Sequence, residues 1–354
     1  MPVPVSNLPE WPSSLEAHPL LVIDFQLLKA GDRNEIERLW EAGTTLGFWY
    51  LKNHGAEQDF VAMWGMGEAL FNLPMDEKIK CSQGDEGASF GYKAPGHYIV
   101  DAAGTTDPIE GINVSKDDAL SYPRISRREY HEVIHQLMHP AITPFVKKCV
   151  HISDTMLEIF NDKLGLPKGA LAKLHSPDEF SESEARTLKA PANLAPGQLA
   201  VGGHTDFGTL SLLVNNLGGL QVLPPGTTEW CYVRPVPGHM ICNVGDTLAM
   251  FSGGLLNSNI HRVVPPPGPQ SAHVRWSQVY FTRPGDSVLL LPLLGESSLI
   301  SEAFDKLSPE KQKSLSPGVT SSEWFTRRQK NYLTKNYKGS QTWTANRGTE
   351  HGRA

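Results

Sequence analysis

The chain has 354 residues, a formal net charge of -6, and 40% hydrophobic against 20% charged residues. This is the composition of a globular protein with a large core, and it excludes the strongly basic character of general nucleic-acid binders, so we expect no nucleic-acid partner. No apolar run is long enough for a membrane span, and the first residues lack the basic and apolar stretches of a signal peptide. Four scattered cysteines without a CxxC pair favour reduced thiols, so we expect a cytoplasmic protein.

The first half of the chain predicts helices and two short strands. Runs at 20–25 and 47–51 predict strands, whereas apolar residues at helical spacing predict helices over 34–43 and 60–71. Residues 82–114 are rich in Gly, Ala, Asp and Pro and show almost no periodicity. Such a stretch is typical of a long binding loop.

The second half changes from helical to β texture. Helical periodicity over 127–164 is interrupted by Pro140 and Pro144, so we expect two helices or one kinked helix. Short β-prone runs separated by turns predict a sandwich or barrel between residues 187 and 284. The main runs are Thr209–Val214, Gly219–Leu223, Trp230–Val233, Thr247–Phe251 and Arg275–Phe281. A helix over 323–337 and a polar, mobile tail from Lys338 are expected to follow.

The β-rich region contains a candidate metal site. His204 and Asp206 are two residues apart, so a strand would present an imidazole and a carboxylate on one face. His261 is the candidate for a third ligand. Two histidines and one carboxylate form the facial triad of non-haem Fe(II) oxygenases, which leaves positions open for other ligands. The alternative is a structural His–Asp pair in a surface turn.

A candidate anion site follows in the same region. Arg275 and Ser277 share one strand face by the same alternation, and a guanidinium beside a hydroxyl suits a carboxylate. The next residues on that face, Val279 and Phe281, are apolar, which predicts a buried arginine. A bound anion would offset the cost of burying it, and a salt bridge to a nearby carboxylate is the alternative.

Several longer motifs resemble the isopenicillin N synthase-like 2-oxoglutarate/Fe(II)-dependent dioxygenases. The resemblance covers roughly residues 20–337. The N-terminal motifs are LLVIDF, GFWYLKNHG and FNLPMDEK, and the C-terminal motifs are GGHTDFGTLSLL, GGLQVL, NVGDTLAMFSGG, SNIHRVV and RWSQVYF. The stretch Leu188–Pro191 departs from the Tyr-Pro pair that the family often has before its HxD motif.

The resemblance implies a mainly β fold, a double-stranded β-helix (jelly roll) core with surrounding helices. We therefore expect an N-terminal region over 1–180, the jelly-roll core over 181–300, and a C-terminal helix and tail over 301–354. The implied Fe(II) ligands and catalytic residues are His204, Asp206 and His261. The implied residues for the 2-oxoglutarate co-substrate are Arg275, Ser277 and, with less support, Asn243 near the iron pocket.

The resemblance also implies an activity. The expected enzyme uses Fe(II), 2-oxoglutarate and O2 to hydroxylate or otherwise oxidise a C–H bond of a small, neutral or aromatic molecule, releasing succinate and CO2. Specialised metabolism is the expected setting, and no oligomeric state is indicated. The alternatives are an oxidase of the isopenicillin N synthase type that needs no 2-oxoglutarate, and a non-enzymatic jelly-roll binding protein.

Candidate substrate-binding residues are aromatic or polar side chains near the metal motif or in the irregular loop. Phe207 directly follows a metal ligand, and the loop supplies the rest. These are Phe90, Tyr92, Tyr98 and Asn113. Ordinary packing of the loop is the alternative. Trp324 and Phe325 on the last helix are candidates for core residues or for a lid over the pocket.

Overall fold

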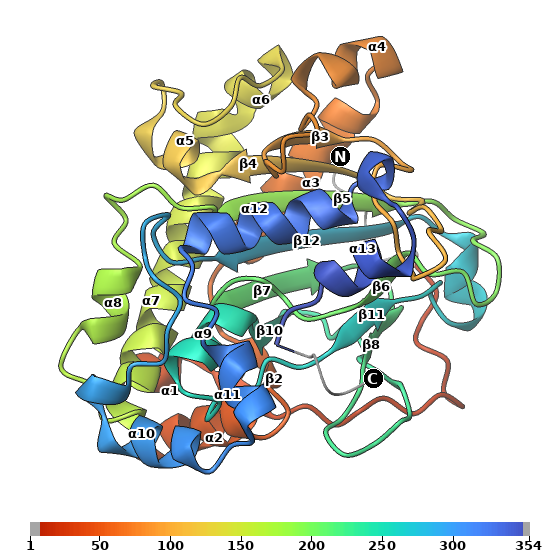
Figure 1. Cartoon of the computed structure of the whole chain (residues 1–354). Helices are drawn as coiled ribbons and strands as arrows, with labels where there is room; N and C mark the ends of the chain where they lie inside the picture. Colours follow the sequence, from red (N-terminus) through yellow and green to blue (C-terminus); the bar gives the residue numbers. More distant parts are fainter. Residues whose placement is uncertain (1–7, 350–354) are drawn as a thin grey trace.

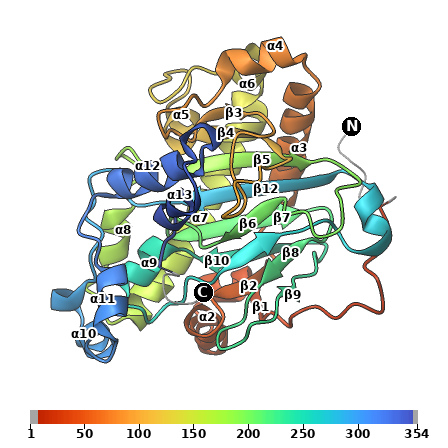
Figure 2. The same cartoon turned by 45° about the vertical axis from the view of Figure 1, so that its right-hand side comes forward.

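Two sheets that face each other form the centre of the protein, with helices packed outside them (Figures 1 and 2). The structure is a computed structural model, and it describes residues 8–349. A buried cluster joins the sheets, with Phe48 and Ile241 from one and Val222 and Val263 from the other. This is the expected jelly-roll core, and the prediction of a mainly β fold with surrounding helices is confirmed.

The larger sheet has eight strands and the smaller has four. In spatial order, the larger sheet contains β1 (Val22–Asp24), β2 (Phe48–Lys52), β10 (His239–Val244), β7 (Leu210–Asn215), β12 (Arg275–Thr282), β5 (Glu184–Ala190), β4 (Glu110–Ser115) and β3 (Gly91–Lys93). The smaller contains β6 (Val201–His204), β11 (His261–Val263), β8 (Leu220–Val222) and β9 (Cys231–Tyr232). Neighbouring strands are antiparallel except β1 and β2.

Helices pack around the two sheets, and α12 (Ser321–Tyr332) lies over a cavity on the inward side of the larger one. They are α1 (Phe25–Lys29), α2 (Arg33–Thr44), α3 (Glu57–Phe71), α4 (Met75–Lys78), α5 (Lys116–Ser121), α6 (Glu132–Leu137), α7 (Thr143–Lys163), α8 (Ala170–Leu174), α9 (Asp246–Phe251), α10 (Ser298–Asp305), α11 (Pro309–Leu315), α12 (Ser321–Tyr332) and α13 (Ser340–Ala345). Helices α3 and α7 pack against β5 and β12. No described helix is long and apolar enough to cross a membrane.

Strand register decides which side chains of the larger sheet face the smaller one. Residues directly opposite each other on neighbouring strands share a face, and the faces alternate along each strand. Asn243 lies opposite Ser211, Ser211 opposite Phe281, and Phe281 opposite Glu184. Because this row contains Asn243 and Ser211, which contact the loop after β6, the inward face also includes the alternate residues of β5 and β12.

Most elements expected from periodicity are present. The predicted strand over 47–51 and the helices over 34–43 and 60–71 correspond to β2, α2 and α3. Over 127–164 the helical chain changes to a π-helical segment at Met138–Ile142, which contains Pro140, before α7 begins. The expected interruption near the prolines is confirmed, since proline cannot donate the backbone hydrogen bond of a regular helix.

Other expectations were wrong. Residues 247–251, predicted as a strand, belong to helix α9, because a short buried apolar run fits either element. The predicted loop over 82–114 contains β3 and β4, which extend the larger sheet. The last long helix ends at Tyr332, and the tail expected to be mobile forms α13 and packs on the core through residue 349.

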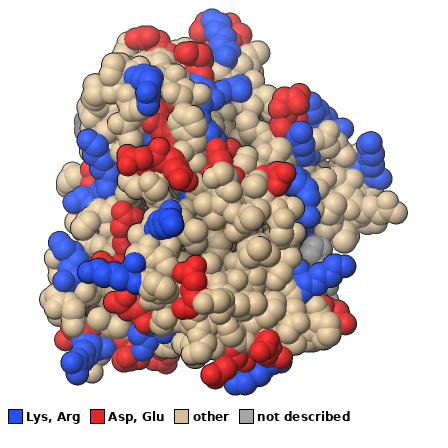
Figure 3. Space-filling model, turned by 60° about the vertical axis from the view of Figure 1, so that its left-hand side comes forward, with Lys and Arg blue, Asp and Glu red and all other residues tan. Residues whose placement is uncertain are grey.

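Surface charges on the face in Figure 3 are mixed, with acidic and basic side chains interspersed and no extended basic area. This agrees with the modest net charge of -6. The absence of a nucleic-acid partner stays a prediction.

A buried ion pair fastens the C-terminal helices to the core. Arg328 of α12 pairs with Asp246, the first residue of α9, and both side chains are completely buried. Arg328 also donates from Nε to the Asn346 carbonyl (2.8 Å) and from Nη2 to the Thr205 carbonyl (3.1 Å). The Thr349 hydroxyl donates to the other carboxylate oxygen of Asp246 (2.6 Å). The pair therefore joins α12, the C-terminal segment and the HxD motif.

Breaking this pair should destabilise the protein strongly. Arg328→Met leaves the Asp246 carboxylate buried without its cation, and we expect a loss of about 3–5 kcal/mol in the free energy of unfolding, measured by urea denaturation. The double variant Arg328→Met/Asp246→Leu should recover part of it, because no charge stays buried. The control is Glu37→Gln, which breaks an exposed pair with Lys163 and should cost less than about 1 kcal/mol. Equal losses in Arg328→Met and Glu37→Gln would contradict the role of Arg328.

Candidate metal centre and cavity

Three potential metal ligands converge at the edge of the smaller sheet. His204 at the end of β6 pairs directly with His261 at the start of β11, and their ring centroids are 4.3 Å apart. The Asp206 Oδ1 atom lies 3.6 Å from Nε2 of each histidine. One ligand atom from each residue lies within 4.8 Å of the others, a spacing that suits one shared metal ion. The structure thus brings together the three residues predicted as Fe(II) ligands.

Neighbouring groups fix the orientation of each side chain. Asp206 Oδ2 accepts hydrogen bonds from Ser211 Oγ (2.6 Å) and Asn243 Nδ2 (2.7 Å), so Oδ1 is left to face the histidines. Nδ1 of His204 lies 2.8 Å from the Gly202 carbonyl, and Nδ1 of His261 lies 3.2 Å from the Asn259 carbonyl. Hydrogen bonds of this kind hold the ring of a metal-binding histidine and leave Nε2 for the metal.

The Asp206 carboxylate is ionised despite its burial. Burial works to raise its pKa, but the adjacent His261, together with hydrogen bonds from His204 and Ser211, holds the pKa well below the ordinary range. The resulting anion, with two imidazoles, is a donor set that suits a divalent transition metal. Asn243, expected to contact the co-substrate, instead binds Asp206 directly.

Arg275 and Ser277 lie farther along the inward face of β12. Arg275 is 4% exposed, and it donates from Nε to the Gly218 carbonyl (2.8 Å) and from Nη1 to Ser277 Oγ (2.6 Å). No carboxylate of the described residues forms an ion pair with it, so the predicted alternative of a salt bridge does not occur there. Burial lowers the pKa of Arg275 to about 10, which still leaves it charged at neutral pH. A buried cation without an anion fits the distal carboxylate of 2-oxoglutarate.

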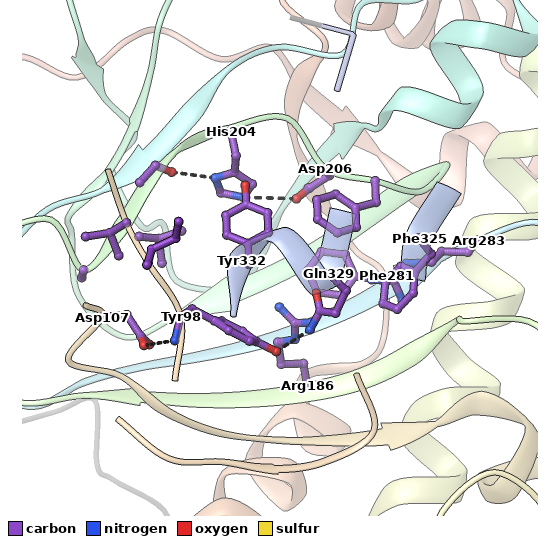
Figure 4. A pocket seen from close by; sticks show the side chains of 16 residues that line it. Tyr98, Asp107, Arg186, His204, Asp206, Phe281, Arg283, Phe325, Gln329 and Tyr332 are labelled. Carbon is purple, nitrogen blue, oxygen red and sulfur yellow. Dashed lines mark hydrogen bonds and ion pairs between the residues drawn. The ribbon is translucent and has the colours of Figure 1, made fainter. Parts of the chain in front are cut away.

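A cavity opens beside the candidate ligands (Figure 4). His204 and Asp206 form part of its wall, and two predicted substrate residues, Phe207 and Tyr98, line it as well. Phe325 also lines the cavity, as expected for a lid. Trp324 belongs to the hydrophobic core, as expected for a core residue. The Phe207 ring packs on Tyr332 and Phe325 of α12, with centroids 5.9 and 5.7 Å apart.

Three predicted substrate residues lie outside this cavity. Tyr92 sits on the outward face of β3, where its hydroxyl donates to Glu110 (2.9 Å) and its ring packs near Phe71. Phe90 is buried with its ring 5.2 Å from the Arg127 guanidinium. The amide nitrogen of Asn113 donates hydrogen bonds to the carbonyl and hydroxyl oxygens of Ser89. The expectation that these three line the pocket is therefore wrong for the cavity next to the metal site.

Other lining residues were not predicted as site residues from the sequence. They are Ile99, Val100, Asp107, Arg186, Ala200, Val201, Gly202, Phe281, Arg283, Gln329 and Tyr332. Strand alternation had placed Phe281 on the same face as Arg275, whereas Arg186 could be found only by extending that face to the paired strand β5. Gln329 and Tyr332 required knowing that α12 closes over the cavity.

Comparisons with known proteins show the family to which the chain belongs. The family model for the 2OG-Fe(II) oxygenase superfamily matches residues 183–284. The family model for the N-terminal region described as "non-haem dioxygenase in morphine synthesis" matches residues 20–136. A 2-oxoglutarate-dependent dioxygenase of Gibberella zeae is 30% identical over 275 residues, 76% of this chain and 80% of that protein. A 1-aminocyclopropane-1-carboxylate oxidase of Dictyostelium discoideum is 27% identical, over 70% of this chain and 77% of that protein.

Several solved structures have a similar fold. A full-length Neurospora crassa protein in complex with alpha-KG has a TM-score of 0.69 and 25% identity, and the match covers 88% of this chain and 95% of that one. JOX2, solved with 2OG, Fe and JA, has a TM-score of 0.66 and 21% identity, covering 96% and 92%. The chain belongs to the 2-oxoglutarate/Fe(II)-dependent dioxygenases, and it is an enzyme that uses Fe(II), 2-oxoglutarate and O2 on small molecules.

Proposed function

We propose that this enzyme oxidises a C–H bond of a small organic molecule held in the cavity, as part of specialised metabolism. Fe(II) is held by His204, Asp206 and His261, and the distal carboxylate of 2-oxoglutarate by Arg275 and Ser277. One observation carries the proposal, namely that three ligand atoms lie within 4.8 Å of one another and two of these residues, His204 and Asp206, line a cavity with aromatic walls. A cytoplasmic location stays a prediction.

The chain's own residues bind, orient and shield the reactants. Bound Fe(II), 2-oxoglutarate and O2 supply the oxidising power, with succinate and CO2 released. Ser211 and Asn243 keep one oxygen of Asp206 directed at the metal, and Arg275 fixes the co-substrate by its far end. Phe207, Phe325 and Tyr332 surround the substrate with apolar surface that excludes water.

The relatives support a small-molecule substrate. The Neurospora crassa protein was also solved in complexes with thymine and with 5-formyluracil, and JOX2 with JA. The protein from Dictyostelium is named for 1-aminocyclopropane-1-carboxylate. The cavity of this chain has walls of Phe207, Phe281, Phe325 and Tyr332, which suits the aromatic or apolar part of such a molecule.

Arg275 favours the use of 2-oxoglutarate over the oxidase alternative. Its guanidinium is buried, charged, and bonded only to a carbonyl and a hydroxyl among the described residues. An enzyme without an anionic co-substrate would bear the cost of burying this charge with no gain.

Removing any metal ligand should abolish turnover without unfolding the protein. We expect His204→Ala, Asp206→Ala and His261→Ala to lose Fe(II)-dependent succinate release, because a facial triad has no spare ligand. Circular dichroism and the bound iron content report on the fold and on the metal. The control is His151→Ala, an exposed histidine on helix α7. Near-normal activity in any of the three would show that the residue is not a ligand.

Loosening Asp206 should weaken iron binding without abolishing it. Asn243→Ala and Ser211→Ala each remove one hydrogen bond to Asp206 Oδ2. The loss of such supporting contacts typically lowers metal affinity by about 10–100-fold, and we expect that range in anaerobic Fe(II) titrations. If Asn243 acted on the co-substrate instead, the KM for 2-oxoglutarate would rise while Fe(II) affinity stayed unchanged.

Removing Arg275 should raise the 2-oxoglutarate requirement. A lost charge-assisted contact is worth about 1.5–3 kcal/mol, so Arg275→Ala should raise the KM for 2-oxoglutarate roughly ten- to hundredfold. Arg275→Lys should recover only part, because an ammonium cannot reproduce the planar fork. Arg124→Ala, at an exposed position, serves as the control. An unchanged 2-oxoglutarate requirement in Arg275→Ala would favour the oxidase reading.

A further inference from the structure

The cavity wall away from the histidines contains two arginines. Arg186 and Arg283 line the same cavity as His204 and Asp206. Figure 4 shows Arg186 on the other side of the cavity from these two residues. Arg186 lies on β5 directly opposite Val279 of β12, on the inward face of the sheet. The cavity beside the candidate metal ligands is therefore also lined by guanidinium groups.

Arg186 has hydrogen-bonding capacity that the described residues do not use. Its Nη2 donates to Glu184 Oε1 (2.6 Å) and lies 3.3 Å from Ser89 Oγ. Neither Nε nor Nη1 has a hydrogen-bond partner among the described residues. The guanidinium lies over the Phe281 ring, 4.8 Å from its centroid, and the side chain is 19% exposed. Arginine carries five N–H donors, so three donors of Arg186 have no acceptor among the described residues.

Charge around Arg186 is also incompletely balanced. Arg283 donates from Nη2 to the same Glu184 oxygen (3.3 Å) and from Nη1 to a backbone carbonyl, and its Nε has no hydrogen-bond partner among the described residues. Two guanidinium groups thus share the single carboxylate of Glu184. Both arginines and Ser89 outweigh the effect of burial on that carboxyl and hold its pKa below the ordinary value.

The other nearby carboxylates are paired with other cations. Asp107, which also lines the cavity, is paired with Lys93. Glu182 is paired with Arg127 (2.6 Å). Burial raises the pKa of Glu182 to about 7, so it adds only part of a negative charge at neutral pH. Arg127 also pairs with Asp286 (2.7 Å). These carboxylates are engaged elsewhere, so Arg186 and Arg283 share Glu184 as their only ion-pair partner among the described residues.

We propose that Arg186, supported by Arg283, binds a carboxylate of the substrate, so that the substrate class is a small aromatic or apolar carboxylic acid. The inference rests on the proposed function, since it assigns the far wall of the same cavity. It replaces the expectation of a neutral molecule. A carboxylate supplies two acceptors in the plane of the guanidinium and a negative charge. The aromatic residues Phe207, Phe281 and Phe325 hold the remainder of the molecule.

This subsite is separate from the one proposed for 2-oxoglutarate. Arg275 and Val279, which pairs with Arg186, are four residues apart on β12. At about 3.3 Å per residue, these positions are roughly 13 Å apart along the strand. Arg186 lines the cavity, whereas neither Arg275 nor Ser277 is among its lining residues, so the proposal assigns the two arginines to different anions.

Binding of matched acids and amides tests the charge requirement. The probes are phenylacetate, 3-phenylpropionate and 2-naphthoate, each compared with its primary amide. Their dissociation constants are measured by calorimetry, without oxygen, on enzyme loaded with Fe(II) and 2-oxoglutarate. We expect at least one acid to bind at least about tenfold more tightly than its amide, as for the gain of one charge-assisted contact. Equal affinities within every pair, or no binding by any acid, would overturn the inference.

Variants of Arg186 locate the contact. Arg186→Gln should weaken binding of the acid roughly ten- to hundredfold and leave binding of its amide nearly unchanged. Arg186→Lys keeps the charge beside Glu184 and should recover part of the affinity, which guards against a loss of folding in Arg186→Gln. The exposed Arg124→Gln is the matched control. Unchanged acid affinity in both Arg186 variants would show that another group binds the carboxylate.

The 2-oxoglutarate reaction separates the two hypotheses. Binding of 2-oxoglutarate to the Fe(II)-loaded enzyme, measured without oxygen, should have the same dissociation constant in Arg186→Gln, because Arg275 and the metal ligands remain. A higher dissociation constant instead would show that Arg186 binds the co-substrate, which overturns the inference. If the unsubstituted enzyme releases no succinate with Fe(II), the proposed function fails, whereas the preference for acids over amides is judged by calorimetry alone.

Discussion

The two oxygens of Asp206 have different roles, and the site depends on this division. Ser211 and Asn243 bind Oδ2 from the larger sheet, so Oδ1 faces the Nε2 atoms of His204 and His261 on the smaller one. The carboxylate therefore joins the two sheets at the point where the metal ligands meet. A metal ligand fixed in this way needs no rearrangement when the ion binds, and its geometry survives only as long as the two sheets keep their spacing.

The larger sheet arranges the remaining chemistry along one face. Arg275 and Ser277 lie toward one end of β12, Phe281 lies toward the other, and Arg186 pairs from β5 between them. Since side chains alternate with a period of two, the register alone places these four residues on one face of the sheet. A slip of one residue in β12 would turn all of them outward. The extensive pairing of β12 with both β5 and β7 opposes such a slip.

Sequence reasoning located the residues whose chemistry is local and missed those whose position depends on distant chain segments. The HxD motif and the Arg275–Ser277 alternation need only strand geometry, and the structure places them as that geometry requires. The prediction that Tyr92 lines the pocket was wrong because β3 joins the sheet in a register that turns the ring outward, which loop composition does not reveal. The prediction of a strand at α9 was wrong because a short buried apolar run fits a helix and a strand equally well. Asn243 lies beside the candidate metal ligands, and its hydrogen bond to Asp206 favours a supporting role over co-substrate binding.

Arg328, Arg275 and Arg186 differ in their interaction partners, and these partners indicate their roles. Arg328 has an aspartate and two carbonyl oxygens, so all parts of its guanidinium are engaged and its role is to hold α12 on the HxD motif. Arg275 has a carbonyl and a hydroxyl but no anion, which leaves a full charge for a co-substrate to neutralise. Arg186 lies between these cases, because it shares one glutamate with Arg283 and keeps unused donors on the cavity wall. Burying a charge without an opposite charge beside it costs free energy. An arginine that lacks its own anionic partner therefore marks a candidate site for an anionic ligand.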